Sequence, residues 1–208
     1  KFKEIKFILN KKNDQITINN LITTLEKPIT CYMRGFSAPV KWETDLNSEE
    51  ELFIFKNEND YFSKYDAVTR IYEFIISERL KGKPLLNFED KLISIFKSLL
   101  ISKNINLSLL SEILNIPSFT EIESYSSVID PQKTNKVLDE LNKRFSMKLK
   151  DELISKFDSI EHNFYKKWPH GKNERKLIKV IWKLLLFSDD SIITNRILKF
   201  VDNKNMTL

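Results

Sequence analysis

Few residues of this 208-residue chain have the types and the spacing that catalysis or metal binding requires. The two histidines, His162 and His170, lie eight positions apart, whereas a helical zinc site needs two histidines one turn apart with a glutamate between them. We therefore expect both histidines to be surface residues of a loop rather than metal ligands. Cys31 is the one cysteine, and a small buried apolar role is favoured for it over that of a nucleophile.

Two acidic groups could attract a cation, namely Glu49 to Glu51 and the pair Asp189 and Asp190. Each group stands where a helix is expected to begin, and first-turn carboxylates bond free backbone amides and complement the helix dipole without any ligand. We interpret both groups as helix caps. The sequence also lacks a Ser-His-Asp order, a glycine-rich phosphate loop and a Walker lysine. We therefore predict no catalytic residue, no metal ligand and no cofactor in this chain.

The most unusual combination of residues stands just before the expected helices. Gly35 is one of only three glycines, which suggests a backbone position with positive φ or a close approach. Arg34 beside it offers a planar donor fork that can bind loop carbonyls or a carboxylate, and large aromatic side chains nearby can pack on the first helices. We predict a rigid structural seam between two domains rather than a ligand site, formed by Arg34, Gly35, Phe36, Pro39 and Trp42.

The composition limits the partners. With 34 Lys and Arg against 29 Asp and Glu, the net charge is +5, but the two signs alternate along most predicted helices, as on solvated helix faces. A nucleic-acid footprint would gather its cations in one stripe, so nucleic acid is not an expected partner. Apolar runs stay well below the ~20 residues of a membrane span, so no membrane association is expected. A single cysteine is typical of a reducing compartment, which favours the cytoplasm.

The first quarter of the chain has the pattern of short strands. Residues 2–9 and 15–18 are rich in β-branched and aromatic residues and flank a polar turn at 10–14, which predicts a hairpin. Two further extended pieces are expected at 29–33 and 38–43. Four short strands are marginal without a partner sheet, so we expect them either to pack on the helices or to be the remaining edge of a larger β domain.

From Ser48 the spacing of apolar residues changes from 2 to 3.6. Ser48 with Glu51 predicts a capping box for a first helix, and Asp60 predicts the cap of a second. The apolar stripe expected on the second helix is Tyr61, Tyr65, Val68, Ile71 and Ile75.

Caps and breakers define the helices that follow. Asn87 predicts the cap of a third helix, and a short fourth is expected to stop at Pro117. Ser118 with Glu121 predicts another capping box. Asp130 and Pro131 predict the start of the longest helix, of ~30 residues at helical spacing.

The last two helices are expected at about 174–187 and 191–202. Glycine is scarce and the connections are short, so consecutive helices should be antiparallel neighbours. The fold class predicted is mainly α, an irregular α-helical superhelix of antiparallel helix pairs preceded by a few short β-strands.

A series of motifs resembles the aminopeptidase N family of zinc metallo-aminopeptidases, in its bacterial and apicomplexan type within the gluzincin group. The run EKPITCYMRGFSAPVK at 26–41 resembles the family's K-P-V-P-S-L-L-R-G/E-F-S-A-P-V-K. The other matches are, in chain order, YFSKYDA at 61–67, EILNIPS at 112–118, VIDP at 128–131, DELI at 151–154 and NKNMT at 203–207. In the second motif Lys64 replaces the family's arginine, which should weaken any bidentate contact there.

The resemblance implies the last strands of a small β-sandwich domain at 1–45 and the first part of a C-terminal helical superhelix at 46–208. It also implies a parent enzyme, a zinc-dependent hydrolase that removes N-terminal amino acids from peptides, whose zinc ligands and catalytic glutamate match no position here. This segment would be an inactive scaffold and cover that limits access to the active-site chamber. Its partners would be the catalytic domain of the same polypeptide and the parent's peptide substrates.

A hypothesis from another class stays open. The chain could be a free-standing helical interaction module that binds an acidic partner through its lysine-rich faces, which predicts a stable fold and a salt-sensitive complex. A catalytic H-E-x-x-H-x18-E pattern encoded upstream would support the enzyme segment, and its absence would support the module.

Overall fold

A computed structural model describes most of this protein. Within the described residues, one short turn of 3-10 helix lies at Arg34–Phe36, and all other helices begin after residue 47. The described residues are 4–8, 11–17, 28–36, 40, 42–124, 130–164, 166 and 170–201. Two compact units divide the chain, Lys1–Thr30 and Cys31–Leu208. The elements of the second unit are η1 (Arg34–Phe36), α1 (Ser48–Asn57), α2 (Tyr61–Leu80), α3 (Leu86–Ile101), α4 (Leu107–Leu114), α5 (Phe119–Glu123), α6 (Pro131–Ile160), η2 (Glu161–Asn163), α7 (Lys172–Leu186) and α8 (Ser191–Val201).

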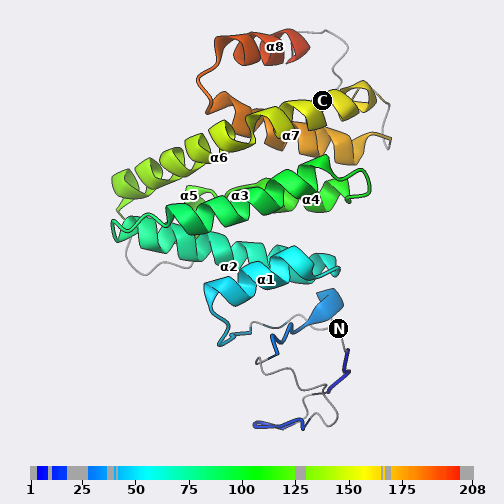
Figure 1. The fold of residues 1–208 in the computed structure, drawn as a ribbon, viewed down its shortest axis with the longest axis vertical. Coiled ribbons are helices and arrows are strands. Elements are labelled where there is room, and N and C mark those ends of the chain that lie inside the picture. The colour runs from blue at the N-terminus through cyan, green and yellow to red at the C-terminus, as the bar shows by residue number, and fades with distance from the viewer. Residues whose placement is uncertain are drawn as a thin grey trace. The chain divides into compact units, whose positions relative to one another are not determined.

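The helices of the second unit stack in successive layers (Figure 1). Helix α1 packs on α2, and α2 packs in turn on α4 and α6. Helix α3 lies along α6, α7 contacts both α4 and α6, and α8 packs on α7. This arrangement confirms the predicted mainly α fold and its irregular α-helical superhelix.

An aromatic cluster holds the middle layers together. Tyr72 of α2, Phe96 of α3 and Phe145 of α6 are at most 2% exposed, and their ring centroids lie 5.9 to 6.4 Å apart. The Tyr72 hydroxyl donates to the carbonyl oxygen of Ile113 in α4 at 3.1 Å, so its one polar atom is satisfied. One cluster therefore joins α2, α3, α4 and α6.

A buried ionic triad joins three of the same helices. The Glu89 carboxylate of α3 is 0% exposed, and Arg79 of α2 donates to both of its oxygens at 2.7 and 2.8 Å. Arg144 of α6 places its Nε 2.9 Å from Glu89 Oε2. Two guanidinium groups thus offset the charge that burial would otherwise make costly.

Most of the predicted helix starts are confirmed. Asp60 accepts from the Ser63 amide at the start of α2, and Ser118 forms the predicted capping box with Glu121. Asp130 caps α6, which has Pro131 in its first turn and runs for 30 residues. A helix cap is a hydrogen bond between residues close in the sequence, so it can be predicted without knowledge of the tertiary fold.

Two predicted caps are wrong. The capping box of α1 is formed by Asn47 and Glu50, one residue earlier than the Ser48 and Glu51 pair, because Asn is as good an N-cap as Ser. Helix α3 begins at Leu86, and its preceding residue makes no capping bond with a described residue, so Asn87 is already inside the helix.

The predicted strands are also wrong wherever the structure describes them. Residues 4–8, 15–17, 29–33, 40, 42 and 43 have no strand structure; the other predicted strand positions, Pro39 among them, lie outside the described residues. A strand needs a neighbour that completes its ladder of hydrogen bonds, and the described residues before 48 form no such ladder.

The stripe on α2 begins later than predicted. Val68, Ile71 and Ile75 are at most 1% exposed, but Tyr61 is 55% and Tyr65 43% exposed. A tyrosine can leave its hydroxyl end in water while its ring covers apolar neighbours, so its hydrophobic spacing is a weak sign of burial.

Candidate functional site: the loop on the first helix pair

The candidate site is the segment Cys31–Phe36, which we call the junction loop, together with Trp42 and the residues of α1 and α2 that hold them. In the loop, Arg34 Nη2 donates to Glu58 Oε1 at 3.1 Å. Glu58 follows α1 directly, is 5% exposed, and accepts from the backbone amides of Asn59 at 2.6 Å and Asp60 at 3.1 Å. Burial opposes ionisation, but those two amides and the Arg34 cation outweigh it and hold the pKa of Glu58 below its ordinary value.

Gly35 anchors the loop through its backbone. Its φ is +69°, and a side chain there would meet no described atom within 4 Å, so positive φ rather than close approach explains the glycine. Its amide donates to the Asp60 carboxylate, which also accepts from the Ser63 amide and hydroxyl at 2.9 and 2.8 Å. Burial raises the pKa of Asp60, but these donors and Arg34 overcome it and lower the pKa.

The loop is strained on both sides of this glycine. Met33 has φ of 55° and Phe36 has φ of 50°, a left-handed conformation that side chains with a Cβ rarely adopt. Such residues cost on the order of 1–3 kcal/mol each and persist only where the surroundings determine them. The bonds from Arg34 to Glu58 at the end of α1 and from Gly35 to Asp60 at the start of α2 supply that restraint.

Aromatic contacts complete the site. The Phe36 ring lies 4.9 Å from that of Phe62 in α2, although Phe36 stays 52% exposed. Trp42 stacks under the guanidinium of Arg70, 4.2 Å from its ring centroid, and meets the Tyr32 ring edge-on at 5.7 Å. Both of the predicted aromatic residues therefore contact side chains that flank or belong to the first helix pair.

Lys64, where the motif resemblance predicts an arginine, connects α2 to the end of α1. Its Nζ donates to the carbonyl oxygen of Phe55 in the last turn of α1 at 2.8 Å and lies 5.7 Å from the Phe55 ring centroid. Burial lowers the pKa of this ammonium, and the Glu58 charge opposes the decrease. A lysine ammonium can donate one hydrogen bond to a carbonyl oxygen at a helix C-terminus, and the planar guanidinium of an arginine is not required for that bond.

Glu51 was predicted as a helix cap, and its burial in the site beside Arg70 is what the sequence reasoning missed. The residue is 5% exposed, and its Oε1 lies 3.6 Å from Arg70 Nε without a hydrogen bond to a described atom. Arg70 Nε donates instead to Asp66 at 3.1 Å. Burial, only partly offset by Arg70, raises the pKa of Glu51 to about 7. One signal was available, since Glu51 stands four residues before the fully buried Phe55 on the same face of α1.

The chain matches a protein family over most of its length. The family is described as "Domain of unknown function (DUF3458_C) ARM repeats", and its model matches residues 48–208. The chain belongs to this family. The matched residues of this chain, which we call the DUF3458_C domain, include all the helices from α1 to α8 that the structure describes.

Relatives of known name are aminopeptidases. Aminopeptidase N of Escherichia coli is 24% identical over 186 residues, which are 87% of this chain and 21% of that protein. Aminopeptidase N of Caulobacter vibrioides is 25% identical over 126 residues, which are 61% of this chain and 15% of that protein. The resemblance seen in the motifs is thereby confirmed, and the chain spans about a fifth or less of these relatives.

A solved structure has the same fold. The crystal structure of Legionella pneumophila aminopeptidase A in complex with aspartic acid matches with a TM-score of 0.74 and 21% identity. The match covers 88% of this chain and 22% of that one. At this identity the likeness establishes the fold of the DUF3458_C domain.

Of the other candidate residues of the sequence, Cys31 is part of the junction loop, whereas the histidines and the pair Asp189 and Asp190 lie in later parts of the chain. His162 and His170 are exposed, while Cys31 is half-buried, and burial raises the pKa of its thiol. Asp190 accepts from the amides of Ile192 and Ile193, as predicted for a cap, whereas Asp189 pairs with Lys143.

Among the described residues, no group of three or more His, Cys, Asp and Glu side chains could hold a metal ion. Likewise, the described helices include none with the length and apolar character needed to cross a membrane.

Proposed function

We propose that this chain is a noncatalytic helical segment of a zinc-dependent aminopeptidase, a hydrolase that removes N-terminal amino acids from peptides. The observation that carries the proposal is its 24% identity to aminopeptidase N of E. coli along 87% of the chain. The family match and the shared fold of a second aminopeptidase support it. We assign the parent enzyme to the cytoplasm, since one cysteine in 208 residues suits a reducing compartment.

The zinc belongs to another part of that enzyme in this proposal. The described residues do not fit a zinc site, because no group of three ligands comes together among them. A metal in such an enzyme polarises the scissile carbonyl. What this chain contributes is a rigid stack of helices that acts as a scaffold and cover and limits access to the active-site chamber.

The junction loop is the proposed seam of that cover. Arg34, Gly35 and Trp42 are tied to Glu58, Asp60 and Arg70, so the loop cannot change its course without breaking contacts to the first helix pair. A loop restrained in this way would hold the preceding domain at a fixed orientation relative to the helical stack. The proposed partners are the catalytic domain of the same polypeptide and the peptide substrates that the cover admits.

The test uses the longer protein and the 208-residue chain side by side. Hydrolysis of an aminoacyl-coumarin substrate and stoichiometric zinc by elemental analysis are expected for the longer protein and not for the chain alone. In the longer protein, Arg34→Ala should change cleavage of long peptides more than that of a dipeptide, because access rather than chemistry is altered. Zinc or activity in the chain alone, or a longer protein without peptidase activity, would reject the proposal.

The alternative is a free-standing helical module that binds an acidic partner. The surplus of five positive charges is the observation that favours it. It requires a complex that weakens as salt rises from about 50 mM to 500 mM, because exposed charges are screened. An open reading frame that encodes no H-E-x-x-H-x18-E pattern upstream of this chain would decide for the module.

A further inference from the structure

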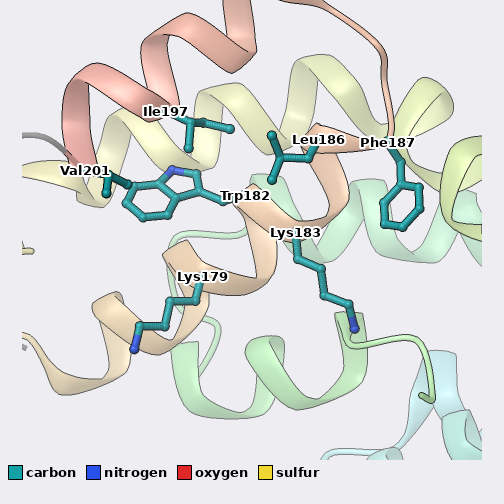
Figure 2. Close-up of a pocket in the computed structure, with 7 residues that line it drawn as sticks. All are labelled: Lys179, Trp182, Lys183, Leu186, Phe187, Ile197 and Val201. Carbon is teal, nitrogen blue, oxygen red and sulfur yellow. The ribbon is translucent and has the colours of Figure 1, made fainter. Parts of the chain in front are cut away.

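Helix α7 carries a row of exposed lysines along one face, which we call the lysine stripe. Its members are Lys172, Lys176, Lys179 and Lys183. Spacings of four, three and four residues return to the same side of an α-helix, and at 1.5 Å per residue the stripe is about 16 Å long. Figure 2 shows two of the lysines extending from α7 in the same direction, away from Ile197 of α8.

Helix α7 departs here from the alternation of charge signs along most of the helices. Glu174 is the acidic residue of α7, and it stands about half a turn away from the stripe. The face that bears the lysines is therefore uniformly positive along the helix. A solvated helix face more often mixes the two signs, so that its charges compensate one another.

The surrounding described residues neutralise the stripe only in part. Lys176 forms an ion pair with Glu112 of α4, and Lys183 donates to the neutral side-chain oxygen of Asn115 at 3.0 Å. These two contacts place the stripe on the side of α7 that faces α4. The other two lysines of the stripe form no ion pair with a described residue.

The charge of the stripe also acts on a nearby carboxylate. The pKa of Glu121 in α5 lies below its ordinary value, chiefly because Ser118 donates hydrogen bonds to it, and the charge of Lys183 adds to the decrease. The stripe therefore favours ionised carboxylates in its vicinity. A carboxylate brought by another molecule would be favoured in the same way.

The residue types indicate an acidic peptide rather than a nucleic acid. Bidentate recognition of phosphate or guanine uses the planar fork of arginine, whereas these cations are lysines. Bases stack on exposed aromatic rings, but the exposed large apolar residue of α7, whose residues are all described, is Leu186. An extended peptide repeats side chains on one side about every 6.6 Å, close to the ~5.4 Å turn of the helix. Glutamates at alternate positions of such a peptide can therefore follow the stripe.

We propose that the lysine stripe binds acidic segments of peptide substrates, so that the enzyme favours peptides with several Asp or Glu residues after the cleaved N-terminus. The proposal rests on the proposed function, since it takes peptides as the substrates of the longer protein. Exposed charges attract over about 10 Å at moderate salt, so the stripe acts as a weak tether. A tether outside the catalytic site strengthens binding of substrate and transition state equally, which lowers KM and leaves kcat unchanged.

The first test is binding of rhodamine-labelled peptides to the 208-residue protein, measured by fluorescence anisotropy. One peptide carries glutamate at alternate positions among serines, and its analogues carry glutamine or lysine there. At about 50 mM salt the glutamate peptide should bind about tenfold or more tightly than the glutamine peptide, and the difference should shrink towards about 500 mM. Equal affinity for these two peptides would overturn the proposal, as would tighter binding of a single-stranded oligonucleotide of equal charge.

A double variant locates the contact. Lys172→Gln with Lys179→Gln removes the two stripe lysines without an ion pair and should weaken the glutamate peptide about fivefold, as loss of two exposed charge pairs predicts. The matched control is Lys133→Gln with Lys136→Gln on exposed positions of α6, which removes the same charge and should change the affinity by less than about twofold. An equal loss in both double variants would show attraction by net charge alone and would overturn the proposal.

The longer protein tests the assignment to substrates. The variant Lys172→Gln with Lys179→Gln should raise KM about fivefold for a peptide with a downstream run of glutamates, with kcat and the KM of a dipeptide unchanged. Peptide binding without this change in KM would make the stripe a docking site for another acidic protein and would overturn the assignment. A longer protein without peptidase activity would instead reject the proposed function, because the anisotropy assay does not depend on cleavage. The two failures are therefore distinguishable.

Discussion

Replacement of Glu51 by glutamine should stabilise this protein above neutral pH. Glu51 is 5% exposed, and its carboxylate lies 3.6 Å from Arg70 Nε, which already donates a hydrogen bond to Asp66. Burial raises its pKa from 4.5 to about 7. The folded state thus holds a proton that the unfolded state releases, so this contribution to stability is complete below about pH 4.5 and is lost as pH rises through about 7.

The size of the effect follows from the pKa values. A difference between 4.5 and about 7 corresponds to about 3 kcal/mol at full ionisation. Glutamine keeps the shape of the neutral acid and cannot ionise. We therefore expect Glu51→Gln to match the wild type at about pH 4 and to exceed it by about 2–3 kcal/mol at about pH 8.

Urea unfolding followed by circular dichroism at 222 nm, at several pH values, measures this difference. The control is Glu49→Gln, in the same first turn of α1, because the Glu49 side chain is 59% exposed and pairs with Lys91. It should change stability by no more than about 0.5 kcal/mol at any pH. If Glu51→Gln were instead less stable than the wild type at about pH 8, the pair with Arg70 would be a net stabilising ion pair, and the reasoning from burial would be refuted.

Three further substitutions test other contacts. Glu89→Gln should cost about 3–5 kcal/mol in urea unfolding, because it leaves the buried guanidinium of Arg79 and the partly buried one of Arg144 without this carboxylate; Glu140→Gln, on the exposed side of Arg79, is its control and should be nearly neutral. Gly35→Ala should cost about 1–2 kcal/mol from its φ of +69°, and an equal cost for Gly35→Asn would argue against a backbone origin. Lys64→Met should lose about 1 kcal/mol with the bond to Phe55, whereas Lys64→Arg should retain most of it by calorimetry.

The helical part of this fold could be predicted from sequence because its signals are local. Asp60, Ser118 and Asp130 cap helices through bonds to amides within three residues, so each cap is readable from a short window. The strand predictions failed for the opposite reason. Alternating apolar residues such as those at 4–8 indicate only a capacity for pairing, and the ladder itself depends on a partner elsewhere.

The candidate site was predicted only in outline. The positive φ of Gly35 and the carboxylate partner of Arg34 both follow from residue type, and both are present. Pro39 lies outside the described residues. It stays a prediction that the five predicted residues form a seam between a domain that ends at residue 45 and one that begins at residue 46. Glu51 escaped because its burial depends on α2 lying over its side of α1, which no property of the first turn reveals.

Glu89 indicates how a stack of similar helices selects its neighbours. Apolar spacing determines which face of α3 is buried, but leucine and isoleucine side chains would pack on almost any other apolar face. The Glu89 carboxylate instead needs Arg79 of α2 and Arg144 of α6 at the same time. A slip of α6 by one turn, about 5.4 Å, would move Arg144 away and leave the fully buried Glu89 carboxylate with Arg79 as its one remaining cation in the triad. The triad therefore penalises wrong registers more strongly than it rewards the right one. A segment whose proposed role is to hold a cover at a fixed orientation requires that kind of selectivity.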